Sequence, residues 1–199
     1  LAYFDTHYYG GIKKYQWTTI PLAIHGVVAK KDGSVVEVVV GEDDNDPVFY
    51  ITDLLPHLAG GQMAKTGGNI IAGEQLNILI GSRPYSVKTG DAVKLNIMKI
   101  LNDKYGITEG DFMSAELEMV PANKARDIGF DRSLIGAYGH DDRVCAYPEI
   151  TATLDTATDR TVMTILADKE EIGSEGTSGM QCVIITDILD EIAKNFGVL

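Results

Sequence analysis

The sequence predicts an α/β fold in two parts, a mostly β part over residues 1–120 and an α/β part over residues 121–199. Three observations support this prediction. Two β-branched runs flank a hairpin signal at residues 31–34. Near Pro121 the alternating pattern ends. An apolar run at residues 161–167 then leads through a glycine-rich loop into a periodic helix, which is typical of an α/β unit.

The first part begins with strands. Residues 1–4 are expected to form a buried strand, and since the chain starts there without a Met, we expect an internal portion of a longer fold. Residues 20–30 and 35–40 are mostly apolar and β-branched, so they are expected to pair across the hairpin turn. Residues 48–51 are expected to add another strand.

Helices and loops complete the first part. Thr52 and Asp53 are expected to cap a helix over residues 54–58, and five glycines in residues 60–75 suggest a mobile loop. After a short strand at 77–80, the pattern at 91–105 predicts a helix that Asp91 begins and Gly106 ends, and 112–120 returns to strand.

The second part alternates between strand and helix signals. A short apolar run at 134–138 precedes a helix expected to start at Asp141 and Asp142, and Pro148 is expected to bend or interrupt that helix. The apolar run at 161–167 predicts a central strand covered on both faces. A helix follows through residues 184–193.

Composition excludes several classes of protein. The net charge of −12 disfavours a nucleic-acid partner, because an acidic surface repels phosphate backbones. No apolar stretch is long enough to predict a membrane span. Cys145 and Cys182 form no disulfide or metal pattern, and we expect buried free thiols in a reducing cytoplasm.

The acidic run 168–171 follows the most apolar predicted strand. Functional groups gather at the carboxyl ends of strands in α/β sheets. Glu170 and Glu171 can therefore face one cleft with different roles, one binding a metal and its neighbour moving a proton. The alternative is a solvated acidic turn that caps the next helix.

A second acidic cluster, His140 to Asp142, lies at another predicted junction between strand and helix. A carboxylate such as that of Asp141 can bridge two cations, whereas the alternative makes Asp141 or Asp142 a helix N-cap. Together the carboxylates of the two clusters indicate a divalent-metal site. The site is incomplete, because zinc prefers some histidine ligands and few histidines lie near either cluster in the sequence.

Two segments carry a family resemblance. GAYGHDDRVCAY (136–147) and DKEEIGS (168–174), with GMQ at 179–181, resemble the aspartyl and vacuolar aminopeptidase family of co-catalytic zinc exopeptidases. The motif YYGGI (8–12) resembles the start of the inserted oligomerisation domain in that family. The resemblance implies a phosphorylase/hydrolase-like zinc-exopeptidase sheet domain with an inserted, mostly β oligomerisation domain over residues 1–120.

The resemblance also assigns roles. It implies that Asp141 bridges two zinc ions, that Glu171 is a terminal ligand of one metal, and that Glu170 is the general base for a metal-activated water. Cobalt or manganese can replace the zinc. It implies that His57 reaches a neighbouring subunit's active site and helps to hold substrate. His7 and His25 are interpreted as structural.

The implied substrate is a peptide with a free N-terminus, and the implied assembly is a homo-oligomer, a dimer or a dodecamer. The family's His-x-Asp motif and its later Asp and His ligands are absent from these 199 residues. Two alternatives therefore stay open: a non-catalytic oligomerisation fragment or degenerate relative, and a related two-metal aminopeptidase or deblocking peptidase. The sequence does not fix the preferred N-terminal residue.

Overall fold

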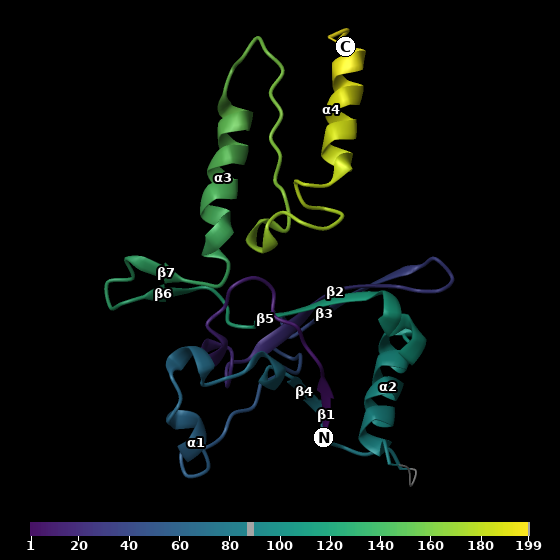
Figure 1. Cartoon of the computed structure of the whole chain (residues 1–199), viewed down its shortest axis with the longest axis vertical. Helices are drawn as coiled ribbons and strands as arrows, with labels where there is room; N and C mark the ends of the chain where they lie inside the picture. Colours follow the sequence, from purple (N-terminus) through teal and green to yellow (C-terminus); the bar gives the residue numbers. More distant parts are fainter. Residues whose placement is uncertain (87–89, 199) are drawn as a thin grey trace. The chain divides into compact units, whose positions relative to one another are not determined.

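The structure, a computed structural model, describes residues 1–86 and 90–198. Its strands and α-helices follow in the order β1 (Ala2–Phe4), β2 (Leu22–Ala29), β3 (Val35–Val40), α1 (Gly60–Met63), β4 (Ile78–Gly81), α2 (Ala92–Tyr105), β5 (Ala115–Pro121), β6 (Arg126–Ile128), β7 (Leu134–Gly136), α3 (His140–Asp155) and α4 (Val183–Asn195) (Figure 1). Short 3-10 turns join several of them. Helices and small antiparallel sheets confirm the predicted α/β class. No helix in the described ranges is long and apolar enough to cross a membrane.

The chain forms two compact units. The first unit comprises Leu1–Tyr8 and Lys13–Tyr138, and the second comprises Tyr9–Ile12 and Gly139–Leu199. This division rests on contacts within the chain. The functional domains 1–120 and 121–199 stay a prediction.

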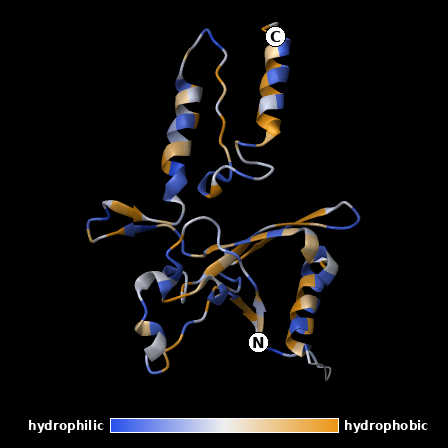
Figure 2. Cartoon of the chain, viewed as in Figure 1, coloured by the Kyte–Doolittle hydropathy of each residue, from blue (hydrophilic) through white to orange (hydrophobic). Residues whose placement is uncertain are grey.

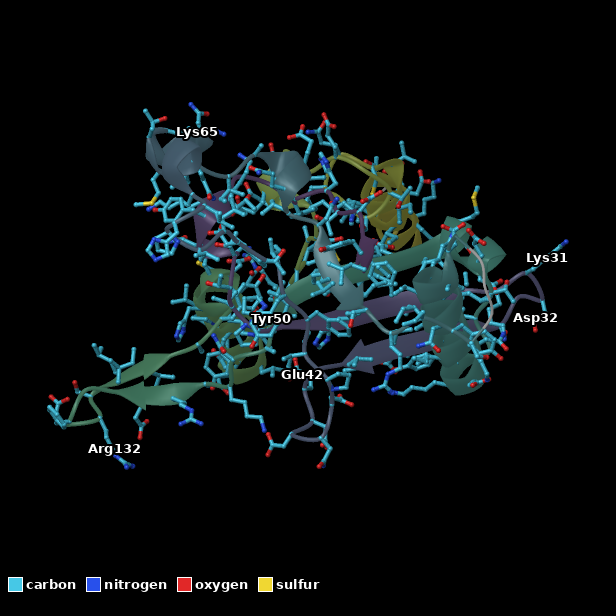
Figure 3. The ribbon with its side chains drawn as sticks, turned by 90° about the horizontal axis from the view of Figure 1, so that it is seen from below. Lys31, Asp32, Glu42, Tyr50, Lys65 and Arg132 are labelled. Carbon is cyan, nitrogen blue, oxygen red and sulfur yellow. The ribbon has the colours of Figure 1, made fainter. Side chains whose placement is uncertain are left out.

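A three-stranded antiparallel sheet of order β3-β2-β5 forms the centre of the first unit. Ile24 of β2 lies opposite Val40 of β3 and Met119 of β5, which fixes the register. The predicted hairpin is confirmed, because the Lys30 amide donates to the Ser34 carbonyl at 2.7 Å and Gly33 adopts φ +85°. Figure 3 shows Lys31 and Asp32 at the outer end of this hairpin.

One face of this sheet is buried. Its core consists of apolar side chains from β2, β3 and the residue that follows the α2 cap: Ile24, Val28, Val38, Val40 and Ile107. Phe4 and Phe112 pack against this core with their ring centroids 5.8 Å apart. Each fully buried aliphatic side chain contributes about 1.5–3 kcal/mol relative to an exposed one.

The strand β1 pairs with β4, and both contact α2. Helix α2 confirms the prediction for residues 91–105: Asp91 occupies the N-cap position without a side-chain cap bond, and Gly106 ends the helix at φ +65°. The first strand is confirmed, but it is not buried, because its residues are partly exposed and Leu1 before it is 73% exposed. The predicted strand at 112–120 begins later, at Ala115, after a 3-10 turn.

The helix predicted over residues 54–58 is wrong. Pro56 disfavours the helical conformation at the residue before it, and the chain instead turns at residues 56–58 before α1. Asp53 accepts hydrogen bonds from the Leu54 amide at 2.8 Å and from Gln62 Nε2 at 2.9 Å. Residues 48–51 form isolated bridges, such as Leu22 with Phe49, rather than a full strand. The glycine-rich segment 60–75 contains α1 and two 3-10 turns.

In the second unit, α3 and α4 confirm the two predicted helices, but the predicted strand at 161–167 does not form. This segment runs without regular secondary structure, because no strand in the described ranges pairs with it. Figure 2 shows hydrophobic residues both along this extended segment and along α4.

Pro148 does not interrupt its helix, and the two cysteines are less buried than predicted. Helix α3 continues through Pro148, and its non-helical residue is Asp141 (φ −88°, ψ 115°). The helix is exposed at Val144, where water can replace the amide partner that Pro148 removes. Both cysteines are free, as expected, but Cys145 is exposed and Cys182 is half-buried, since the helices around them cover little surface.

Candidate functional site

The acidic loop, defined as residues 168–182, turns sharply at Glu170 and Glu171. These two residues lie in a single 3-10 turn, Glu170–Ile172. The Gly173 amide donates to the Glu170 carbonyl at 2.8 Å, and the Ser174 amide donates to the Lys169 carbonyl at 2.8 Å. Backbone hydrogen bonds therefore fix the position from which both glutamate side chains start.

Backbone conformations on both sides of this turn are unusual. Lys169 adopts φ +67° and Ser174 adopts φ +59°, a region that residues with a side chain seldom occupy. Such conformations persist where the surrounding contacts determine them, and they concentrate at functional sites. The backbone of the acidic loop therefore has a defined conformation, while its glutamate side chains are exposed.

Asp168 anchors the start of the loop. Ser178 Oγ donates to one carboxylate oxygen of Asp168 at 3.0 Å, and the Lys169 amide donates to the other at 2.7 Å. The Lys169 ammonium lies 3.3 Å from the same carboxylate. These interactions, led by the Ser178 hydrogen bond, hold the pKa of Asp168 below its usual value.

Gly179 and Gln181 hold the far half of the loop against the turn. Gly179 is buried, and a side chain there would begin only 2.2 Å from the Ser174 carbonyl oxygen. The backbone amide of Gln181 donates to the Ser174 carbonyl oxygen at 3.2 Å, and its side-chain Nε2 donates to the Gly173 carbonyl oxygen at 2.5 Å. Asp168, Gly179 and Gln181 lie in the motifs DKEEIGS and GMQ, which carry the family resemblance, but the sequence assigns them no individual role.

The segment Tyr9–Ile12 lies against the same loop. Gly10 adopts φ +63°, and a side chain there would begin 3.3 Å from Glu171 Cβ. The Lys169 ammonium lies 5.9 Å from the centre of the Tyr9 ring. The predicted YYGGI motif therefore contacts the acidic loop within the second unit.

Asp141 lies at the start of α3. The N-cap of this helix is Gly139 at φ +84° without a side-chain cap bond, and Asp141 within the first turn has an extended backbone (φ −88°, ψ 115°), so the interpretation of Asp141 or Asp142 as a cap stays open. The peptide bond between Asp141 and Asp142 is cis. Arg143 Nη1 donates to the Gly139 carbonyl at 2.9 Å, which ties the first turn of the helix to the preceding glycine.

The carboxylates of Asp141, Glu170 and Glu171 are all exposed. Within the described ranges no hydrogen bond or ion pair engages their oxygens or joins Asp141 to the two glutamates, and no three His, Cys, Asp or Glu side chains gather as a metal site. Unengaged carboxylates suit zinc, which binds such oxygens at about 2.0–2.2 Å. The residues therefore fit part of a zinc ligand set.

Three of the four histidines, His7, His25 and His57, occupy separate places in the first unit. His57 is exposed in the turn at 56–58, where the Leu58 amide donates to the Leu55 carbonyl at 2.9 Å. His25 Nε2 lies 2.8 Å from Glu42 Oε1, and His7 stacks on Tyr8 at 5.4 Å. These contacts agree with a structural role for His7 and His25.

Comparisons with known proteins agree with one another. Residues 1–198 match the family model described as aminopeptidase I zinc metalloprotease (M18). The chain is 59% identical over 201 residues to a probable M18 family aminopeptidase 1 of Clostridium acetobutylicum, covering 99% of this chain and 43% of that protein. A counterpart in Thermotoga maritima is 50% identical over 197 residues, with 99% and 43% coverage. The chain thus spans less than half the length of these relatives.

Solved structures show the same similarity. The crystal structure of the M18 aminopeptidase from Thermotoga maritima superposes with a TM-score of 0.92 at 48% identity, covering 100% of this chain and 44% of that chain. The S. cerevisiae mApe1 dodecamer gives a TM-score of 0.59 at 20% identity, with 94% and 41% coverage, and shows similarity of fold alone.

Proposed function

We propose that the whole protein is a zinc-dependent aminopeptidase that removes N-terminal residues from peptides, since this chain belongs to the aminopeptidase I zinc metalloprotease (M18) family. The observation that supports this most is the ordered turn that carries Glu170 and Glu171. Two adjacent, exposed carboxylates in a fixed loop suit a division between binding a metal and moving a proton.

In this proposal each carboxylate has its own task. Asp141 and Glu171 would each hold metal through their carboxylates, with Asp141 shared between the two metals, and the remaining ligands would come from outside these residues. Zinc, when bound, polarises the peptide carbonyl and acidifies a water molecule. Glu170 accepts the proton of the attacking water and passes it to the leaving amine. Two zinc ions are expected per active site, and cobalt or manganese can use the same ligands.

The proposed substrate is a peptide with a free α-amino group, which binds at the metal site and makes the enzyme an exopeptidase. The free thiols of Cys145 and Cys182 support a reducing, cytoplasmic location. Residues 1–120 are proposed to be an inserted oligomerisation domain, and the second part to belong to a phosphorylase/hydrolase-like sheet domain.

His57 is proposed to help hold substrate in a neighbouring subunit's site. Its exposure in a turn of the first unit supports this, because an exposed side chain is accessible to a partner. This role requires at least a homodimer, and the dodecamer of S. cerevisiae mApe1 is the model for a larger assembly.

A second candidate function is a non-catalytic assembly piece. It is favoured by one observation: within the described ranges no three potential ligands gather around Asp141 or Glu171. In that case the acidic residues would be remnants of a lost site.

The two functions are separated by an activity assay on the whole purified protein. A peptide with a free N-terminus and its N-acetylated form are compared, with and without a chelator. The proposal predicts cleavage of the free peptide only, lost with the chelator and restored by zinc. No cleavage of either peptide after zinc is supplied would contradict it and favour the assembly piece.

A further inference from the structure

Two consecutive residues of the Tyr9–Ile12 segment contact the acidic loop, although the two lie far apart in the sequence. Tyr9 lies beside the Lys169 ammonium, and Gly10 lies against Glu171. The segment belongs to the same compact unit as the loop. The contacts therefore involve the residue before Glu170 and the residue after it in the sequence.

Glycine is strongly favoured at position 10. Its φ of +63° lies in the left-handed region, and an added Cβ would stand 3.3 Å from Glu171 Cβ and 3.4 Å from the Glu171 carbonyl oxygen. At the neighbouring Gly11 an added Cβ would meet nothing within 4 Å. The close approach is thus specific to Gly10 and is directed at the backbone of Glu171.

We propose that Gly10 is a positioning residue for the acidic loop. Its missing side chain lets the Tyr9–Ile12 segment lie directly against Glu171, and this contact keeps the Glu170–Glu171 turn in the arrangement that the reaction uses. The effect on catalysis rests on the proposed function, whereas the effect on the order of the loop does not.

The physical need for such a contact follows from the loop itself. Lys169 and Ser174 hold unfavourable backbone conformations, which require support from their surroundings. Within the described ranges the Glu171 side chain makes no hydrogen bond, so on this side packing against Gly10 is the constraint. Loss of this support would let Glu171 vary in position, and ligands that are poorly oriented hold a metal less tightly.

The first test measures amide hydrogen exchange in the zinc-free whole protein. Gly10→Ala is compared with two controls: Gly11→Ala, which adds a methyl group in open space, and Gly33→Ala, which has φ +85° and no neighbour within 4 Å. The Gly173 and Ser174 amides, which close the turn, are expected to exchange about tenfold faster in Gly10→Ala. Both controls are expected to leave those rates unchanged.

The second test measures zinc affinity and kinetics with the same variants. Gly10→Ala is expected to weaken zinc binding by about 10–100-fold, as loss of support behind a ligand does. It is also expected to lower kcat by about tenfold with KM nearly unchanged, because Glu170 is displaced rather than the substrate. Gly11→Ala is expected to match the unmodified protein in both.

Tyr9→Ala tests the same contact without straining the backbone, should Gly10→Ala fail to fold. It is expected to accelerate exchange at Gly173 and Ser174 by about threefold through loss of the Lys169 contact. Exchange in Gly10→Ala equal to that in Gly11→Ala, or in Tyr9→Ala equal to the unmodified protein, would overturn the proposal. So would faster exchange with unchanged zinc affinity and kcat. Absence of zinc-dependent cleavage in the unmodified protein would instead contradict the proposed function alone.

Discussion

The two units of the chain differ in how they are held together. Every fully or nearly fully buried apolar side chain of the described residues belongs to the first unit, including Leu22, Ile78 and Ile107. In the described part of the second unit only Gly179 is buried, and apolar residues of α4 such as Val183 and Ile188 are 72% and 46% exposed. Within these residues, which span less than half the length of the curated relatives, the first unit packs a sheet on a core, and hydrogen bonds and close backbone contacts order the acidic loop of the second unit.

Because of this difference, the residues that form the buried core and the candidate catalytic residues lie in different units. The core of the first unit contains no candidate catalytic group, whereas Asp141, Glu170 and Glu171 all lie exposed in the second unit. A loop whose shape depends on Ser178, Gln181 and Gly10 has few buried contacts, so small local changes can displace it. We therefore expect substitutions in the two units to have different consequences.

The largest effect is expected from Glu170→Gln in the whole protein. Removal of a general base lowers kcat by about 10²–10⁴-fold, while the unfolding free energy of the 199-residue chain should change little because Glu170 is exposed in it. Peptide cleavage and urea unfolding measure the two quantities. Glu175→Gln makes the same charge change in the same loop and is expected to retain activity. Full activity of Glu170→Gln would contradict the proposal that Glu170, in the second unit, is the general base.

The next effect concerns stability and compares one substitution in both units. Leu22→Ala, at a fully buried site, is expected to lower the unfolding free energy of the 199-residue chain by about 2–5 kcal/mol. Leu154→Ala, at a site 78% exposed, is expected to stay within about 0.5 kcal/mol. Urea unfolding of both variants gives the difference. Equal losses would show that the two units are not built differently.

A third prediction tests whether the first unit also serves the reaction. His57→Ala is expected to lower kcat/KM by roughly 10–100-fold, since substrate would be held less well, while light scattering shows an unchanged oligomer. His25→Gln changes a histidine of the same unit that pairs with Glu42, and it is expected to leave kcat/KM unchanged. If both variants are fully active, the chemistry is confined to the second unit.

The smallest effect concerns the anchor of the acidic loop. Ser178→Ala removes the main cause of the lowered Asp168 pKa, so this pKa should rise toward its usual value of 3.8. Because the folded-state pKa is depressed, the stabilisation is present above pH 3.8 and is lost as the pH falls through the lower folded value. An NMR titration of the Asp168 carboxyl group measures this, with Thr177→Ala as the control. An unchanged pKa would assign the shift to Lys169 instead.

Local patterns predicted the elements that depend on near neighbours. The hairpin of β2 and β3 follows from two β-branched runs around Gly33, and α2 follows from its apolar face and Gly106. The strand predicted at 161–167 does not form. An apolar sequence indicates that a segment favours burial, but it does not indicate which strand will pair with it. The helix predicted over 54–58 does not form, because Pro56 disfavours the helical conformation at the residue before it.

The candidate site was predictable in its carboxylates and not in their supports. Glu170 and Glu171 stand out as adjacent acidic residues after an apolar run. The hydrogen bond from Ser178 to Asp168 and the approach of Gly10 to Glu171 depend on how distant backbone segments fold together. A single sequence holds no periodicity that encodes such contacts.

The central claim is that Asp141 and Glu171 belong to a two-zinc site of the whole protein. Elemental analysis of the purified whole protein, without added metal, tests it most directly, with Asp141→Asn as the comparison. We predict close to two zinc ions per chain in the unmodified protein and a clear loss in Asp141→Asn, because a bridging carboxylate serves both metals. No tightly bound metal after zinc is supplied, or the same zinc content in both proteins, would contradict the account.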